Sequence, residues 1–63
     1  MDQINTPFGQ IVELRQVFHE TGVRLLRVII REGGKYTSLD LDPRSAHTWG
    51  HAMSAWAEQQ RGD

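Results

Sequence analysis

Five cationic or aromatic side chains are the residues of this sequence best suited to binding chemistry. Cations bind the phosphates of a nucleic acid, and an aromatic ring gives a base a surface on which to stack. If one face of a sheet collects these side chains, it forms a platform for single-stranded nucleic acid. The candidate residues are Arg15, Arg27, Arg31, Lys35 and Tyr36.

The same set of residues supports two other interpretations. Glu13 and Asp40 would pair with the arginines across neighbouring strands, which leaves an ordinary solvated sheet face. Leu25 and Ile29 alternate with the arginines and would instead form an oligomer contact. All three interpretations stay open at the level of sequence.

Two histidines have a spacing that metal sites use. His47 and His51 are four residues apart, which puts both imidazoles on one face of a helix. No third ligand is fixed nearby, because Glu58 lies two helical turns beyond His51. No nucleophile or orienting acid stands at a catalytic spacing from any histidine. We therefore expect no metal, no other cofactor, no small-molecule substrate and no enzymatic activity.

Two tryptophans and a methionine recur at helical spacing near the C-terminal end. Trp49, Met53 and Trp56 would cage a ligand or form part of a core. Aromatic rings supply the large apolar area that a small domain needs, so a core role is the more common one.

Alternating apolar and polar residues predict three strands. They cover residues 10–18, 23–31 and 36–41. Two consecutive glycines, Gly33 and Gly34, favour a tight hairpin between the second and third of them. Residues 1–9 contain Pro7 and Gly9 and are expected to form a loosely ordered lead segment.

A helix is predicted to follow the third strand. Asp42 can cap the free amides, and Pro43 suits the first helical position because it has no amide hydrogen. The helix is expected to run to about Gln60, with Gly62 as its stop. At 100° per residue one stripe of it is apolar and should pack on the sheet. The stripe consists of Ala46, Trp49, Met53, Trp56 and Ala57.

The size of the chain predicts a single domain that associates with itself. The chain has 63 residues, a mass of 7.2 kDa and no cysteine. Domains this small usually depend on disulfides, a metal or a second chain. With disulfides excluded and a metal not expected, a symmetric homodimer is the favoured supplement.

Hydropathy and charge narrow the expected partners. No segment approaches the roughly 18 apolar residues of a membrane span, and residues 1–5 lack the basic start of a secretory signal. We therefore expect no membrane partner and, by default, a cytoplasmic location. Residues 10–36 hold five cations and three anions, whereas residues 37–63 hold two cations and four anions. The mildly basic first half permits an anionic partner.

Three features occur in order between residues 24 and 57. A strand ends in Ile30-Arg31-Glu32, a turn carries Lys35, and the segment Ser38-Leu39-Asp40-Leu41-Asp42-Pro43 leads into a helix that contains Trp49. This stretch resembles the core of the positive cofactor four family, which are transcriptional coactivators with single-stranded-DNA-binding domains. The resemblance implies a dimer that binds single strands on a curved, basic sheet, and it assigns that surface to the five candidate residues.

Two features depart from that family. Its longer, lysine-bearing loop is reduced here to Gly33-Gly34. It also has four strands where three are predicted here, so Phe8-Gly9 would have to begin an additional one.

Together these patterns predict an α+β domain over residues 10–61. Its expected architecture is a three-stranded antiparallel β-meander followed by one C-terminal helix packed on one sheet face. The leading functional hypothesis is weak binding of single-stranded nucleic acid on the basic sheet face, in a regulatory role. The alternative is a non-catalytic protein-interaction or homodimerisation module without nucleic-acid activity.

Overall fold

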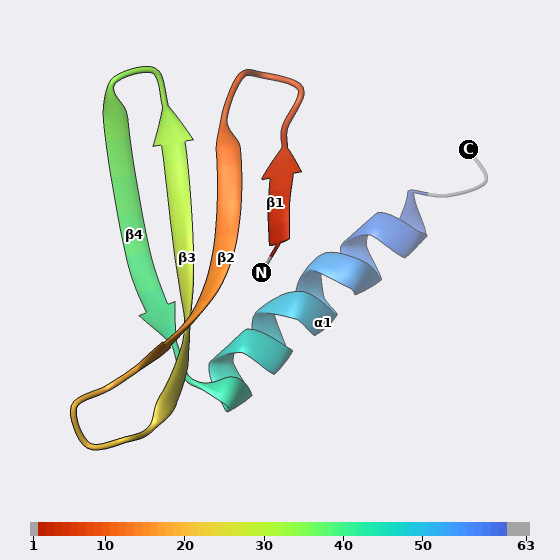
Figure 1. Cartoon of the computed structure of the whole chain (residues 1–63). Helices are drawn as coiled ribbons and strands as arrows, with labels where there is room; N and C mark the ends of the chain where they lie inside the picture. Colours follow the sequence, from red (N-terminus) through yellow and green to blue (C-terminus); the bar gives the residue numbers. More distant parts are fainter. Residues whose placement is uncertain (1, 61–63) are drawn as a thin grey trace.

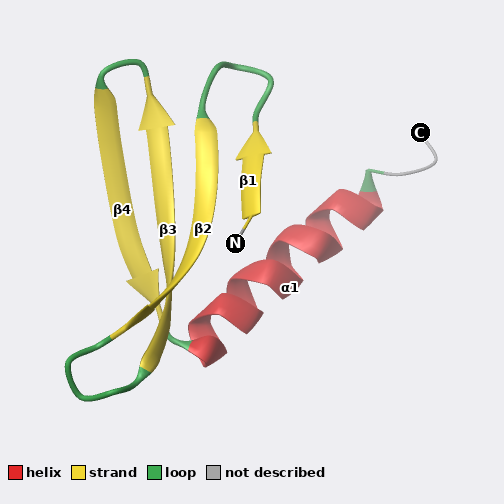
Figure 2. Cartoon of the chain, viewed as in Figure 1, coloured by secondary structure: helices red, strands yellow, loops and turns green. Residues whose placement is uncertain are grey.

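A computed structural model describes residues 2–60, which form an antiparallel sheet and one helix (Figure 1). The elements are β1 (Asp2–Asn5), β2 (Ile11–Phe18), β3 (Arg24–Glu32), β4 (Lys35–Leu41) and α1 (Pro43–Gln59). The strands lie side by side in chain order, so the sheet is a meander with β1 and β4 at its edges (Figure 2). The α+β class and the antiparallel sheet with a C-terminal helix are therefore confirmed.

The prediction of three strands was wrong, because the lead residues supply a fourth. β1 pairs with β2 in the register Asp2 to Leu14 and Asn5 to Ile11. The connection between them is fixed by Thr6, whose hydroxyl donates to the Gln10 carbonyl at 3.0 Å. The edge of β2 thus gives these polar residues the backbone partners that their own sequence pattern does not reveal.

The register divides the sheet residues between two faces. One face, called here the arginine face, carries Arg15, Arg27 and Arg31 together with Glu13, Ile29, Tyr36, Ser38 and Asp40. The other, called here the aliphatic face, carries Val12, Leu14, Leu26, Val28, Ile30, Leu39 and Leu41. Successive side chains of a strand point to opposite faces, so this assignment follows directly from the pairing.

The buried residues belong to both faces of the sheet. Val28 and Leu41 are 8% and 9% exposed and lie on the aliphatic face. Ile29 is 2% exposed and lies on the arginine face. Both faces of the sheet therefore contribute buried residues to the core.

Helix α1 begins where the sequence predicted. The Asp42 side chain accepts a hydrogen bond from the Ser45 amide at 3.1 Å, and Pro43 is the first helical residue. The helix ends at Gln59, with Gln60 as its C-cap. The expected stop at Gly62, and residue 61 at the expected domain end, lie outside the described residues.

The helix does not cover a face of the sheet. It contacts β3 and β4, which it meets beside its start, and then diverges from the strands toward its C-terminal end (Figure 1). No residue of α1 is buried. The expectation that the apolar stripe packs on the sheet as core was therefore wrong. A single residue, Asp42, separates β4 from α1, and so short a connection leaves little freedom to swing the helix onto the sheet.

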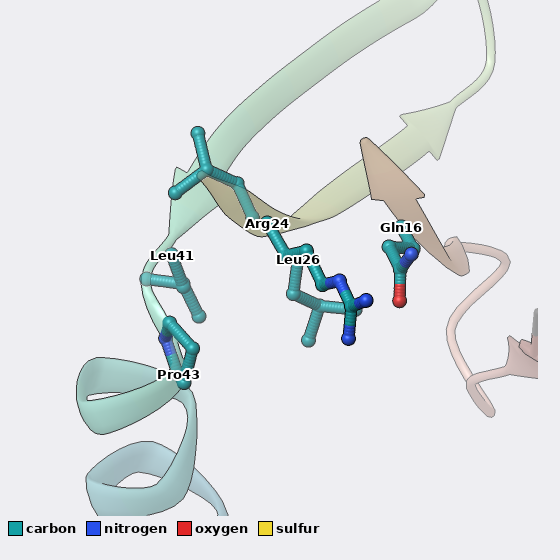
Figure 3. Close-up of a pocket in the computed structure, with 6 residues that line it drawn as sticks. Gln16, Arg24, Leu26, Leu41 and Pro43 are labelled. Carbon is teal, nitrogen blue, oxygen red and sulfur yellow. The ribbon is translucent and has the colours of Figure 1, made fainter. Parts of the chain in front are cut away.

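A small hollow lies at the junction of sheet and helix (Figure 3). Its volume is about 130 Å³. Sites for drug-sized ligands usually measure about 300–1,000 Å³, so this hollow has room for a few water molecules rather than a substrate. It is lined by Gln16, Arg24, Leu25, Leu26, Leu41 and Pro43.

Candidate binding surfaces

The structure brings four of the five predicted binding residues to one face. Arg15 lies directly opposite Arg27, and Arg31 lies directly opposite Tyr36. Lys35 precedes Tyr36 in β4, so strand alternation turns it to the aliphatic face at the end of the hairpin. Gly33 in this hairpin has a φ of 58°, the left-handed conformation that glycine adopts without strain.

Each arginine of this face has a carboxylate partner. Arg15 pairs with Glu13, and Arg31 approaches the other oxygen of that carboxylate, Nη2 to Oε1, at 3.4 Å. Arg27 donates two hydrogen bonds to the Asp40 carboxylate, from Nε to Oδ1 at 2.9 Å and from Nη2 to Oδ2 at 3.2 Å. The pairs Arg27–Asp40 and Arg31–Glu13 join neighbouring strands, as the solvated-face interpretation predicted, whereas Arg15–Glu13 lies within β2. They cancel two of the three positive charges on this face.

The ion pairs shift the pKa values of several of the side chains that form them. The hydrogen bond from Arg15 holds the pKa of Glu13 below its ordinary value, and the nearby charges of Arg15 and Arg31 act in the same direction. The hydrogen bond from Arg27 lowers the pKa of Asp40, and that contact in turn raises the pKa of Arg27. Both carboxylates therefore stay ionised at neutral pH and keep the arginines paired.

The face nevertheless keeps exposed groups that a ligand can reach. The side chains of Arg15 and Arg31 are each 53% exposed, and Tyr36 is 61% exposed. β1 extends the sheet edge beside β2, so residues 2–5 lie beside this face and not over it. Its chemistry is that of a mixed-charge surface with one accessible aromatic ring.

The histidines form no metal-binding cluster within residues 2–60. The rings of His47 and His51 stack with centroids 6.3 Å apart on the exposed side of α1. No third histidine or carboxylate in the described part of the chain completes a ligand set with them. His19 lies instead in the turn after β2, where its Nδ1 lies 2.9 Å from the Thr21 hydroxyl.

The apolar stripe of α1 is the surface whose role sequence reasoning assigned wrongly. Trp49, Met53 and Trp56 are 46%, 62% and 65% exposed. Met53 and Trp56 line a shallow apolar groove together with Ala52 and Ala57. The signal that could have corrected the assignment is the one-residue connection to β4, because helical periodicity shows that a face is apolar without showing what covers it.

No helix among residues 2–60 has the length and apolarity needed to cross a membrane.

No curated protein and no solved structure gives a significant match to this chain. A comparison with protein families does match it, over residues 1–59, to a family of unknown function, DUF6967. That match spans nearly the whole chain, which therefore belongs to the DUF6967 family.

Proposed function

We propose that this chain is a non-catalytic interaction module that works as a homodimer and associates through the apolar stripe of α1. The observation that carries the proposal is the exposure of Trp49, Met53 and Trp56 on one side of one helix. Soluble monomers rarely leave large apolar side chains gathered in this way, and such patches mark association surfaces. Tryptophan is also enriched among the residues that dominate binding energy at protein interfaces.

The exposed area of the chain agrees with a missing partner. The chain exposes 5366 Å². A compact monomer of 7.2 kDa would expose about 4,100 Å². The excess of roughly 1,200 Å² per chain is of the size that obligate homodimers bury, because their interfaces remove about 2,000–5,000 Å² in total.

The dimensions of the chain support the same proposal. Its radius of gyration is 13.7 Å. A compact domain of this length would have a radius of about 11 Å. We attribute the difference to the helix that diverges from the sheet, and a second copy laid along this helix would give a more compact body.

Sedimentation equilibrium tests the proposal directly. We expect the chain to sediment at about twice 7.2 kDa at micromolar concentration. Trp56→Asp should raise the dimer dissociation constant at least tenfold, because it places a charge in the contact between the two apolar stripes. His51→Asp introduces the same group on the opposite side of the helix and should leave the constant unchanged. A wild-type mass of 7.2 kDa at tens of micromolar would overturn the proposal.

A second candidate function is the binding of single-stranded nucleic acid on the arginine face. The observation in its favour is the alignment of Arg15, Arg27 and Arg31 on one face, with the exposed ring of Tyr36 opposite Arg31. Arginines can hold phosphates, and the ring can stack on a base. The two carboxylates oppose this role, so any affinity should be low and strongly dependent on salt.

Charge variants separate this candidate from the first. Binding of a labelled oligonucleotide should weaken steeply as salt rises, and it should be lost with Arg27→Glu and Arg31→Glu. Glu13→Gln and Asp40→Asn should strengthen it, because they free the arginines. Glu58→Gln makes the same charge change on the helix and serves as the control. Absence of binding by the Glu13→Gln, Asp40→Asn double variant at low salt would eliminate this candidate.

A further inference from the structure

We infer that the two helices of the proposed dimer pair antiparallel about a twofold axis at Met53. The inference rests on the proposed function and specifies how its contact is built. Trp49 lies four residues before Met53, and Trp56 lies three residues after it. An antiparallel pair centred on Met53 therefore brings Trp49 alongside the partner's Trp56 and places the two methionines against each other.

The two flanks of the stripe differ in side-chain size. At 100° per residue, both tryptophans lie on one side of Met53, whereas Ala46, Gly50 and Ala57 lie on the other. A twofold axis perpendicular to both helices brings like flanks together. The four tryptophans then form one cluster, and the helix backbones approach each other along the flank of small residues.

No neighbour among residues 2–60 explains on steric grounds why position 50 is a glycine. It lies inside α1, where glycine is unfavourable compared with alanine. A Cβ built on it would meet nothing within 4 Å. A second helix passing along the small flank supplies a close neighbour, which the described part of the chain does not.

The charges of the helix favour the antiparallel direction. α1 has no acidic residue in its first turn and no basic residue in its last turn. Arg44 instead stands near the positive end of the helix dipole, and Glu58 stands near the negative end. A parallel pair would bring like ends together, with both sheets at the same end. An antiparallel pair places each end beside its opposite.

Single-cysteine variants test the direction cleanly because the native chain has no cysteine. A disulfide needs Cβ atoms about 3.5–4.5 Å apart. In the antiparallel pair, two Met53→Cys chains can meet this condition. Two Ala46→Cys chains cannot form a disulfide, because the two cysteines would lie about 21 Å apart along the helices. Ala46→Cys should instead cross-link with Gln60→Cys when the two variants are mixed.

The cross-linking outcomes keep the inference apart from the proposed function. Oxidation with diamide should give a covalent dimer of Met53→Cys but not of Ala46→Cys or of the control His51→Cys. Efficient cross-linking of Ala46→Cys with itself would show a parallel pair and overturn the inference while leaving the dimer. A stable dimer of reduced Met53→Cys that does not cross-link would overturn it as well. A monomer in sedimentation would instead remove the proposed function.

A second measurement tests the close approach at Gly50. Gly50→Leu should raise the dimer dissociation constant at least tenfold while the helix signal in circular dichroism is retained. His47→Leu adds the same side chain on the exposed side of α1 and should leave the constant within about twofold. An unchanged constant for Gly50→Leu would overturn the proposed flank.

Discussion

Ile29 is 2% exposed although it lies on the face that carries the arginines. In the register it stands between Glu13 on β2 and Ser38 on β4. In the same strand, Arg27 lies two residues before Ile29 and Arg31 lies two residues after it. Long arginine side chains can cover apolar surface with their stems while their charged ends stay in water. We therefore expect the stems of Arg27 and Arg31 to cover part of Ile29.

The burial of Ile29 leads to a stability prediction. Ile29→Val should lower the free energy of unfolding by about 0.5–1.5 kcal/mol, and Ile29→Ala by about 2–5 kcal/mol. Ile4 is 50% exposed, so Ile4→Val should change it by less than about 0.5 kcal/mol. Guanidinium denaturation followed by circular dichroism measures all three. Equal effects at the two isoleucines would contradict the burial of Ile29.

At the scale of the element, the start of α1 depends on one carboxylate. Asp42 accepts a hydrogen bond from the Ser45 amide. Hydrogen bonding to the Ser45 side chain first, and to its backbone amide second, holds the pKa of Asp42 below its ordinary value. A carboxyl whose folded pKa is depressed stabilises the fold above its unfolded pKa. That stabilisation is lost as the pH falls through the folded pKa. The cap should therefore weaken in acid, below about pH 4.

Substitution of the cap gives the second prediction. Asp42→Ala should lower the melting temperature at pH 7 by several degrees, because the Ser45 amide loses its acceptor. Asp42→Asn keeps an oxygen acceptor and should lose much less. It should also remove the part of the acid sensitivity that belongs to this residue. Thermal melts between pH 3 and pH 7 measure both effects. Equal melting temperatures for the alanine variant and the native chain would refute the cap.

The elements also show how far sequence patterns reach. The three longer strands and the cap at Asp42 follow from local features, namely alternation and a capping residue before proline. β1 has no such pattern, since Asp2-Gln3-Ile4-Asn5 holds one large apolar residue and pairs only because the edge of β2 accepts it. The alignment of three arginines was predictable from period two. The turning of Lys35 away from them follows from the same rule once the strand is known to begin at that residue.

At the scale of the whole molecule, the direction of the helix could not be read from its periodicity. A stripe that contains Trp49 and Trp56 packs equally well on the chain's own sheet or on another copy. Which of the two surfaces the stripe contacts depends on the short connection through Asp42 and on how much of the sheet is already covered by its own side chains. The chain folds the sheet by local pairing of neighbours, and we propose that it completes its core by association.

Coupled folding and association should make the thermal stability depend on concentration. For a dimer of this size, a tenfold dilution should lower the melting temperature by roughly 5 °C, since mass action favours separated chains. Trp49 and Trp56 lie in the proposed contact between the two apolar stripes, so their fluorescence should report the same transition. Trp56→Asp, measured at concentrations below its raised dimer dissociation constant, should melt at a temperature that does not change with dilution. A wild-type melting temperature that stays constant over a hundredfold range of concentration would mean that the exposed stripe is stable in water. The excess of surface would then belong to the monomer itself.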